Sequence, residues 1–99
     1  MKLTEKQFQE QVIDLAHIYH WKVAHFRPAQ TSKGWRTPVG ADGKGFPDLV
    51  LARKGQVLFI ELKSDDGKVT EEQREWLNEL DGILWRPQDL ETIAKVVLR

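Results

Sequence analysis

The sequence predicts a mixed α/β fold, in which helices cover a small mixed sheet and the elements follow the order αβββαβα. Three observations predict it. Two capping-box sequences each precede a helical pattern of apolar residues. Several short stretches are rich in strand-forming residues, and a Lys54-Gly55 turn separates two of them. With 99 residues the chain has room for one small core, so we expect a single domain over residues 1–99.

The first helix is expected to begin after Thr4, because Thr4 and Gln7 have the spacing of a capping box. The helix is expected to end near His20. Along it, apolar residues recur at helical spacing on one face, namely Phe8, Val12, Leu15, Ala16 and Tyr19. A short strand over residues 21–26 follows.

Residues 27–45 are expected to form a long loop, because proline and glycine recur through them. A loop of this length in a small domain is typically functional or disordered. Function is favoured here by Trp35, which would stack on a base or pin the loop. It is also favoured by a basic set consisting of Arg27, Lys33, Arg36 and Lys44.

Two further strands are expected over residues 47–53 and 56–64, paired as a hairpin that ends at residues 65–67. Thr70 and Gln73 form a second capping box, which predicts a helix running to about Leu80. A strand over residues 83–85 and a last helix from about Gln88 to Leu98 complete the chain. The remaining tryptophans are expected in the core, namely Trp21, Trp76 and Trp85.

Composition excludes several classes of protein. The absence of cysteine excludes disulfides and thiolate-bound zinc, and the three histidines lack zinc-site spacing. No uncharged run approaches the roughly 18 residues that a membrane helix needs. The N-terminus lacks the apolar segment of a signal peptide, so we expect a protein that works inside a cell, without a membrane partner. The zero net charge still allows a local basic surface for a phosphate backbone.

Asp48, Glu61 and Lys63 are the candidate catalytic residues. Period-2 alternation places Glu61 and Lys63 on one face of their strand, and pairing of the two strands brings Asp48 beside them. Asp48 taken alone is more simply explained as a turn residue. Glu61 and Lys63 are more simply explained as a solvated strand end or as a weak ion pair. Val57 and Phe59 share their face, so we expect a core there that partly desolvates the charges. The joint pattern therefore favours a site.

Oxygen ligands such as Asp48 and Glu61 suit Mg²⁺ or Mn²⁺, and the backbone carbonyl of Leu62 is a further candidate ligand. Glu5 is expected near the centre of the inward helical face. There it either completes the metal shell or only stabilises the start of the helix through the helix dipole. Gln73 either hydrogen-bonds within the pocket or only completes its capping box. Such an ion would activate water and stabilise charge on a phosphodiester. Lys63 would then hold the attacking water or neutralise the transition state.

The basic set is expected to contact the nucleic-acid backbone without specifying bases. His25 shares a strand face with Arg27, and the two either meet DNA phosphates or form an exposed pair. The predicted DNA-binding residues are therefore His25, Arg27, Lys33, Arg36 and Lys44.

Pro47-Asp48 together with Glu61-Leu62-Lys63 is similar to the PD-(D/E)xK nuclease motif, and the predicted order is similar to the restriction-endonuclease-like core. More narrowly, the chain resembles the VRR-NUC (virus-type replication-repair nuclease) domain in its small stand-alone form from phages and bacteria. The likeness covers nearly the whole chain: residues 4–12, 25–28, 45–50, 61–64 and 70–77 carry it.

The resemblance implies an Mg²⁺- or Mn²⁺-dependent DNA endonuclease in the cytoplasm of a bacterial cell. It further implies a homodimer acting on branched DNA such as four-way (Holliday) junctions. Asp48, Glu61 and Lys63 carry over as the catalytic core, joined by Glu5 and Gln73.

Two alternatives remain open at this point. One is a non-catalytic nucleic-acid-binding module on the same fold, and the other is a site-specific restriction-type nuclease. The apolar residues of the last helix either form a dimer contact or only cover the sheet, these being Leu90, Ile93, Val96 and Val97.

Overall fold

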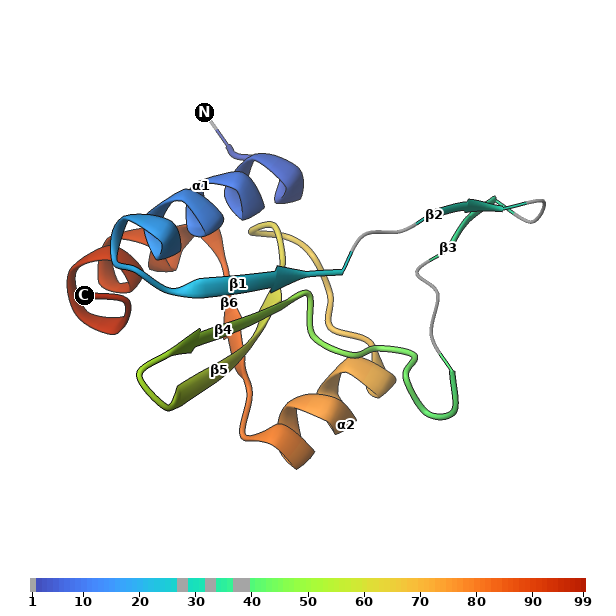
Figure 1. The fold of residues 1–99 in the computed structure, drawn as a ribbon. Coiled ribbons are helices and arrows are strands. Elements are labelled where there is room, and N and C mark those ends of the chain that lie inside the picture. The colour runs from blue at the N-terminus through green and yellow to red at the C-terminus, as the bar shows by residue number, and fades with distance from the viewer. Residues whose placement is uncertain (1, 27–28, 32–33, 37–39) are drawn as a thin grey trace.

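A computed structural model describes residues 2–26, 29–31, 34–36 and 40–99 of the chain. For residues 29–31 and 34–36 only the backbone is described, and for the other described residues the side chains are described as well. The predicted mixed α/β class is confirmed, with one helix before the first strand, one helix before the last strand, and a helical C-terminus (Figure 1). Within the described residues, no helix combines the length and the apolar character needed to cross a membrane.

The main sheet has four strands in the order β1-β4-β5-β6. Strands β1 (Lys22–His25), β4 (Leu49–Arg53) and β5 (Gln56–Leu62) are antiparallel neighbours, and β6 (Ile83–Trp85) runs parallel to β5. The predicted hairpin is therefore confirmed, with Arg53 opposite Gln56 across the Lys54-Gly55 turn. The parallel fourth strand makes the sheet mixed, as expected.

Both capping boxes are confirmed. Helix α1 (Glu5–Ile18) begins after Thr4, whose hydroxyl accepts a hydrogen bond from the Gln7 backbone N–H while the Gln7 side chain accepts one from the Thr4 N–H. Thr70 and Gln73 make the same reciprocal pair at the start of α2 (Glu71–Leu80). Each box satisfies two backbone donors that a helix start otherwise leaves unpaired, which fixes where these helices begin.

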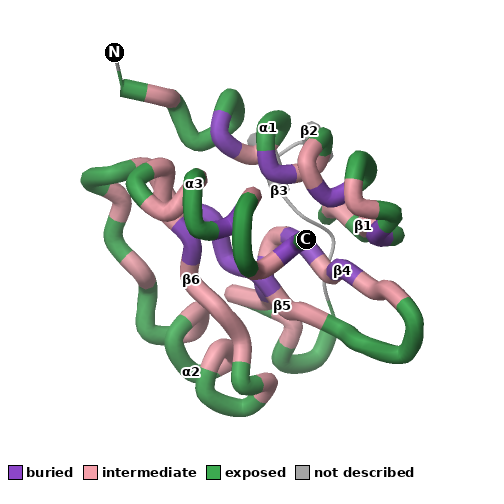
Figure 2. Tube along the Cα trace, turned by 90° about the vertical axis from the view of Figure 1, so that its left-hand side faces the viewer, coloured by how far each residue is buried: buried purple, intermediate pink, exposed green. Residues whose placement is uncertain are grey.

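One face of the sheet carries the main core. Alternate residues of the central strands are fully buried on this face, namely Leu49, Leu51, Ile60 and Leu62. They pack with the inward residues of α1 and of the C-terminal helical segment in one cluster. Figure 2 shows buried stretches, in purple, on α1 and on the central strands. The other face is covered by α2, which contacts β5.

The expected loop over residues 27–45 is in part a second, smaller sheet. Strands β2 (Ala29–Thr31) and β3 (Gly34–Arg36) pair antiparallel, with Gln30 opposite Trp35. The prediction of a loop was wrong here because three-residue strands are too short to show alternation, and the neighbouring glycines and prolines dominate the local signal. In Figure 1 this hairpin projects away from the body of the domain.

The predicted last helix is present, but it is not one regular α-helix. The segment consists of a 3₁₀ turn η1 (Pro87–Asp89), one α-helical turn α3 (Leu90–Thr92) and a π-helical stretch η2 (Ile93–Val97). The Leu98 N–H donates to the Ile93 carbonyl, five residues back, at 3.0 Å. This wider turn lets both Ile93 and Leu98 point into the core, where each is at most 1% exposed.

The C-terminal segment covers the sheet and leaves little apolar surface free. Ile93 is buried, and Leu90 and Val97 pack against the core, so only Val96, 70% exposed, faces outward among the four residues predicted for a dimer contact. The indole N–H of Trp21 and the guanidinium of Arg53 both donate to the Leu98 carbonyl at 2.9 Å. These two contacts hold the end of the chain against the sheet.

Candidate active site

Asp48 and Glu61 lie opposite each other across the β4–β5 hairpin. Leu49 pairs with Ile60, and one further step of the same antiparallel register places Asp48 opposite Glu61 on the same face. The Leu62 backbone N–H donates to Asp48 Oδ2 at 2.9 Å, which fixes the Asp48 side chain against β5. The Asp48 carbonyl accepts a hydrogen bond from the Phe26 N–H at 3.2 Å. The site is therefore built on the central strands of the sheet.

Lys63 lies directly after the end of β5. Its Nζ is 3.8 Å from Glu61 Oε2, and the side chains of Lys63 and Glu61 are only 13% and 2% exposed. The Lys63 backbone N–H donates to the Trp85 carbonyl at 3.1 Å, which extends the pairing with β6 past the end of β5. The three predicted catalytic side chains are thus brought together, and the ammonium is mostly shielded from water.

The expectation of a core along the whole Glu61 face was only half right. Phe59 is half-buried against Phe46, but Val57 is 49% exposed. Alternation correctly places Val57, Phe59 and Glu61 on one face. It does not reveal how far along the strand the covering helix reaches, and Val57 sits next to the hairpin turn, at the far end of β5 from the site.

Burial is the main cause of the unusual electrostatics of Glu61. It raises the pKa of the Glu61 carboxyl to about 8, helped by the negative charge of Asp48 and by a hydrogen bond between the two carboxyl groups. The nearby Lys63 ammonium lowers this pKa, by less. Glu61 Oε1 is buried and has no hydrogen-bond partner among the described residues. An oxygen in this position favours a proton or a cation beside it.

Glu5 influences the site without joining the pair closely. The pKa of its carboxyl is raised, first by partial burial and then by the charge of Asp48, although the residue as a whole remains exposed. Among the described residues, no three His, Cys, Asp or Glu side chains are gathered closely enough to hold a metal ion. The structure therefore does not bring Glu5 together with Asp48 and Glu61 as a preformed third ligand, and its metal role stays a prediction.

Gln73 is engaged in the capping box of α2. Its Oε1 accepts from the Thr70 N–H at 2.9 Å, which commits one end of the amide to the helix start. A catalytic role for the remaining end of the amide stays a prediction, as does the Leu62 carbonyl as a ligand.

The loop before Asp48 rests directly on α2. Gly45 has a φ of +87°, and a Cβ built there would lie 2.7 Å from the backbone carbon of Glu72 and 2.8 Å from the Gln73 nitrogen. Phe46 packs edge-on against Trp76, with 5.1 Å between ring centroids. The sequence analysis missed this support for Asp48, because only the fold reveals which helix the glycine meets.

Arg86 is a second residue that the sequence analysis missed. Its Nη1 donates to the carbonyls of Ser64, Gly67 and Asp65, at 2.7, 2.8 and 3.4 Å. The guanidinium thereby organises the turn that follows Lys63. A lone arginine after a short strand carries no sequence signal for this role.

The predicted DNA-binding residues fall into three groups. His25 is half-buried at the end of β1, and its role stays a prediction. Arg27 and Lys33 lie outside the described residues, and for Arg36 and Trp35 only the backbone of β3 is described. Of the basic set, Lys44 alone has a described side chain, and the DNA contacts of the whole set stay predictions.

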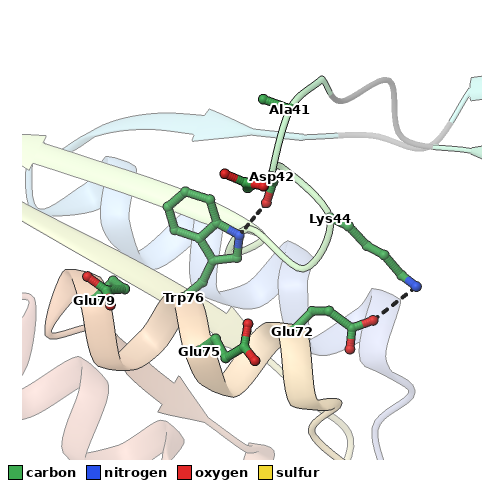
Figure 3. Close-up of a pocket in the computed structure, with 7 residues that line it drawn as sticks. All are labelled: Ala41, Asp42, Lys44, Glu72, Glu75, Trp76 and Glu79. Carbon is green, nitrogen blue, oxygen red and sulfur yellow. Dashed lines mark hydrogen bonds and ion pairs between the residues drawn. The ribbon is translucent and has the colours of Figure 1, made fainter.

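Lys44 lies in acidic surroundings. Its Nζ is 2.9 Å from Glu72 Oε1, and the hydrogen bond lowers the pKa of that carboxyl (Figure 3). The same surface forms a pocket of about 680 Å³ lined by Ala41, Asp42, Lys44, Glu72, Glu75, Trp76 and Glu79. The Trp76 indole N–H donates to the Asp42 carbonyl across this pocket at 3.0 Å. The neighbouring carboxylates weaken the case for a phosphate contact at Lys44, which stays a prediction.

The raised pKa of Glu61 predicts that the metal-free protein loses stability as the pH rises. In the unfolded chain this pKa returns to about 4.5, against about 8 in the folded protein. Between these values the folded state holds an extra proton, so the stabilisation is complete below the lower value and is lost as the pH rises through the upper one. Urea unfolding in EDTA at about pH 5 and about pH 9 measures the change.

The matched control for this measurement is Glu61→Gln, which keeps the shape but cannot titrate. All other residues are common to the two proteins, so the difference between wild type and variant isolates Glu61. The same loss of stability in both proteins would contradict a raised pKa at Glu61.

The residues present fit a small divalent cation. Asp48 and Glu61 supply oxygen donors from adjacent strands, and the buried Oε1 of Glu61 is without a hydrogen-bond partner among the described residues. Mg²⁺ and Mn²⁺ prefer such carboxylate oxygens and keep several waters, so two protein carboxylates are a sufficient anchor.

Comparison with known proteins assigns the family. No curated protein and no solved structure matches the chain. The sequence signature of the VRR-NUC domain matches residues 4–83, which include the two carboxylates and the lysine of the site. This match, over most of the 99 residues, agrees with a four-stranded mixed sheet flanked by helices, the nuclease fold of the PD-(D/E)xK type. The chain therefore belongs to the VRR-NUC domain family of DNA nucleases.

Proposed function

We propose that this protein is an Mg²⁺- or Mn²⁺-dependent endodeoxyribonuclease that hydrolyses phosphodiester bonds, with a preference for branched DNA such as four-way junctions. The observation that carries the proposal is the meeting of Asp48, Glu61 and Lys63 at one end of the central hairpin. Glu61 lies on β5, Asp48 lies directly before β4 and Lys63 directly after β5, so the paired strands hold the three residues close to one another.

Asp48 and Glu61 would hold the cation. Glu5 is close enough for the charge of Asp48 to raise the pKa of the Glu5 carboxyl. When bound, the ion supplies Lewis-acid chemistry, lowering the pKa of a coordinated water and offsetting charge on the phosphate. The Asp48 side chain is already fixed by the Leu62 N–H, which limits the reorganisation needed on binding.

Lys63 would act on the reacting phosphate. Its ammonium is mostly buried and next to Glu61, so it is held in place and interacts more strongly than a solvated lysine does. It would donate hydrogen bonds to the attacking water or to the phosphate oxygens as negative charge develops there. Hydrolysis forms one bond from water oxygen to phosphorus and breaks one bond to a sugar oxygen, which leaves with a proton.

The preference for branched DNA is supported by two features. The resemblance to the stand-alone form of the domain in phages and bacteria implies a symmetric dimer that acts on such substrates, and it also supports action in the bacterial cytoplasm. In addition, the β2–β3 hairpin projects from the body beside the end of β1 (Figure 1), in the segment that carries Arg27, Lys33 and Arg36. A homodimer would present two sites related by a twofold axis, as cutting two strands symmetrically requires.

A cleavage panel tests the proposal. Purified protein is incubated with duplex, single-stranded, flap and four-way-junction DNA of matched sequence, with Mg²⁺, Mn²⁺ or EDTA. We expect cutting with either ion, none in EDTA, and the fastest cutting on the junction. Sedimentation of the protein with and without junction DNA reports the dimer.

Two outcomes would contradict the proposal in different ways. DNA binding without cutting under any divalent ion would establish the non-catalytic binding module instead. Cutting of duplex DNA at one fixed sequence would establish the restriction-type alternative.

A further inference from the structure

Phe26 lies in one row with the two carboxylates of the site. His25 pairs with Leu49, so the next step of this antiparallel register places Phe26 opposite Asp48, as their backbone hydrogen bond of 3.2 Å confirms. Asp48 is in turn opposite Glu61. Residues directly opposite across antiparallel strands share a face. With neighbouring strands about 5 Å apart, the Phe26 side chain emerges one strand away from Asp48.

The Phe26 ring is held in place yet remains open to solvent. It packs edge-on against Phe46, with 5.5 Å between centroids, and Phe46 is itself held by Phe59 and Trp76. In spite of these contacts Phe26 is 45% exposed. A single exposed aromatic residue is common on protein surfaces and needs no function by itself. Phe26 differs from such residues in its position: its ring packs on Phe46, and it lies opposite Asp48, a carboxylate of the site.

A nucleotide at this site would bring its base near Phe26. With the reacting phosphate beside Asp48 and Glu61, the base one sugar away lies within reach of a ring on the neighbouring strand. Aromatic rings stack on any base, but in an intact duplex the base is already stacked and paired. The ring therefore has a partner only where the nucleotide beside the cut is unpaired, as at a branch point or in a single strand.

We propose that Phe26 is a base-stacking residue, and that it selects DNA in which a nucleotide next to the scissile phosphate is unpaired. The inference rests on the proposed nuclease function and deepens it, because it assigns the choice of substrate to one side chain of the edge strand. Stacking of this kind contributes enough to change binding by about tenfold or more.

The first test scans the substrate with Phe26→Leu and Phe26→Trp. Leucine keeps an apolar contact with Phe46 but offers no ring, whereas tryptophan keeps the ring. The nucleotides around the mapped cut are replaced one at a time by an abasic residue, and single-turnover rates are measured. For wild type we expect about a tenfold loss at one position only, and for Phe26→Leu about a tenfold loss on intact DNA with no further loss at that position.

The control outcome separates stacking from mere support of Phe46. If Phe26→Leu were slower by the same factor on intact DNA and on every abasic substrate, the residue would be structural and the inference overturned. Rates for Phe26→Leu equal to those of wild type on intact DNA would overturn it as well. Recovery of the single-position pattern in Phe26→Trp supports it.

A second test reads stacking without cleavage, so that failure of the nuclease function is seen separately. A 2-aminopurine base is placed at each position around the branch, and its fluorescence is followed on titration with protein in EDTA. Quenching at one position by wild type and Phe26→Trp, and its absence with Phe26→Leu, supports the inference even if no cutting occurs. Equal fluorescence with all three proteins overturns the stacking role, whatever the cleavage panel shows.

Discussion

Replacement of Lys63 by alanine is expected to reduce the single-turnover rate of DNA cleavage by roughly 10³-fold. The Lys63 ammonium lies 3.8 Å from Glu61 Oε2 on a side chain that is only 13% exposed, so water would not replace its charge at full strength. The loss is expected in the chemical step, since one ammonium adds little to the binding of a whole branched DNA. Quench-flow rates at saturating protein and an equilibrium binding titration separate the two.

Lys95→Ala is the matched control, because Lys95 is also paired with a glutamate, Glu91, at 2.7 Å, but on the exposed surface of the C-terminal segment. This variant should cut at the wild-type rate. Circular dichroism and thermal unfolding must show that Lys63→Ala is folded. Cleavage by folded Lys63→Ala at the wild-type rate would remove Lys63 from the catalytic set.

Replacement of Gly45 by alanine is expected to destabilise the protein by roughly 2–4 kcal/mol. Two effects add. The φ of +87° is strained for any residue with a Cβ, and the new methyl group would lie 2.7–2.8 Å from the backbone and Cβ atoms at the start of α2. Since neither backbone can rotate away, the loop leading to Asp48 or the helix must move. Thermal unfolding should show a midpoint lower by roughly 10–25 °C.

Two other glycines separate these effects. Gly55 has a φ of +84°, and no atom of the described residues lies within 4 Å of a built Cβ, so Gly55→Ala should show the backbone strain alone, about 1 kcal/mol. Gly40 has no described atom within 4 Å of a built Cβ and no such φ, so Gly40→Ala should change stability little. Equal midpoints for Gly45→Ala and Gly55→Ala would show that the contact with α2 does not matter.

The parts of the fold that were predictable are those fixed by neighbours in the sequence. The capping boxes at Thr4 and Thr70 depend on residues three positions apart, and the central hairpin on a two-residue turn between β-forming stretches. The β2–β3 hairpin escaped prediction because its strands are three residues long. The π-helical ending was hidden because Ile93 and Leu98 gain burial only once the sheet is in place.

The candidate site divides in the same way. Alternation along β5 and the hairpin register were enough to predict that Asp48, Glu61 and Lys63 lie close together. The contacts that hold these residues in place could not be predicted from the sequence. Arg86 follows α2 in the sequence, yet it binds the turn that follows Lys63 and precedes α2. Gly45 contacts α2 only once the chain is folded. Neither the pKa of Glu61 nor the exposure of Val57 could be obtained without knowing how far the helices extend.

The hairpin that carries Asp48 and Glu61 is a short, continuous stretch of chain, and Asp48 is joined to Leu62 at a separation of 14 residues. The spacing of the two carboxylates is therefore independent of how long the rest of the polypeptide is. Lengthening the β2–β3 projection, or exchanging it for another, would leave the spacing of the two carboxylates unchanged, and under the proposed DNA contacts of this segment it would alter which DNA is presented. Such modularity offers a route by which substrate range diversifies while the chemistry is retained.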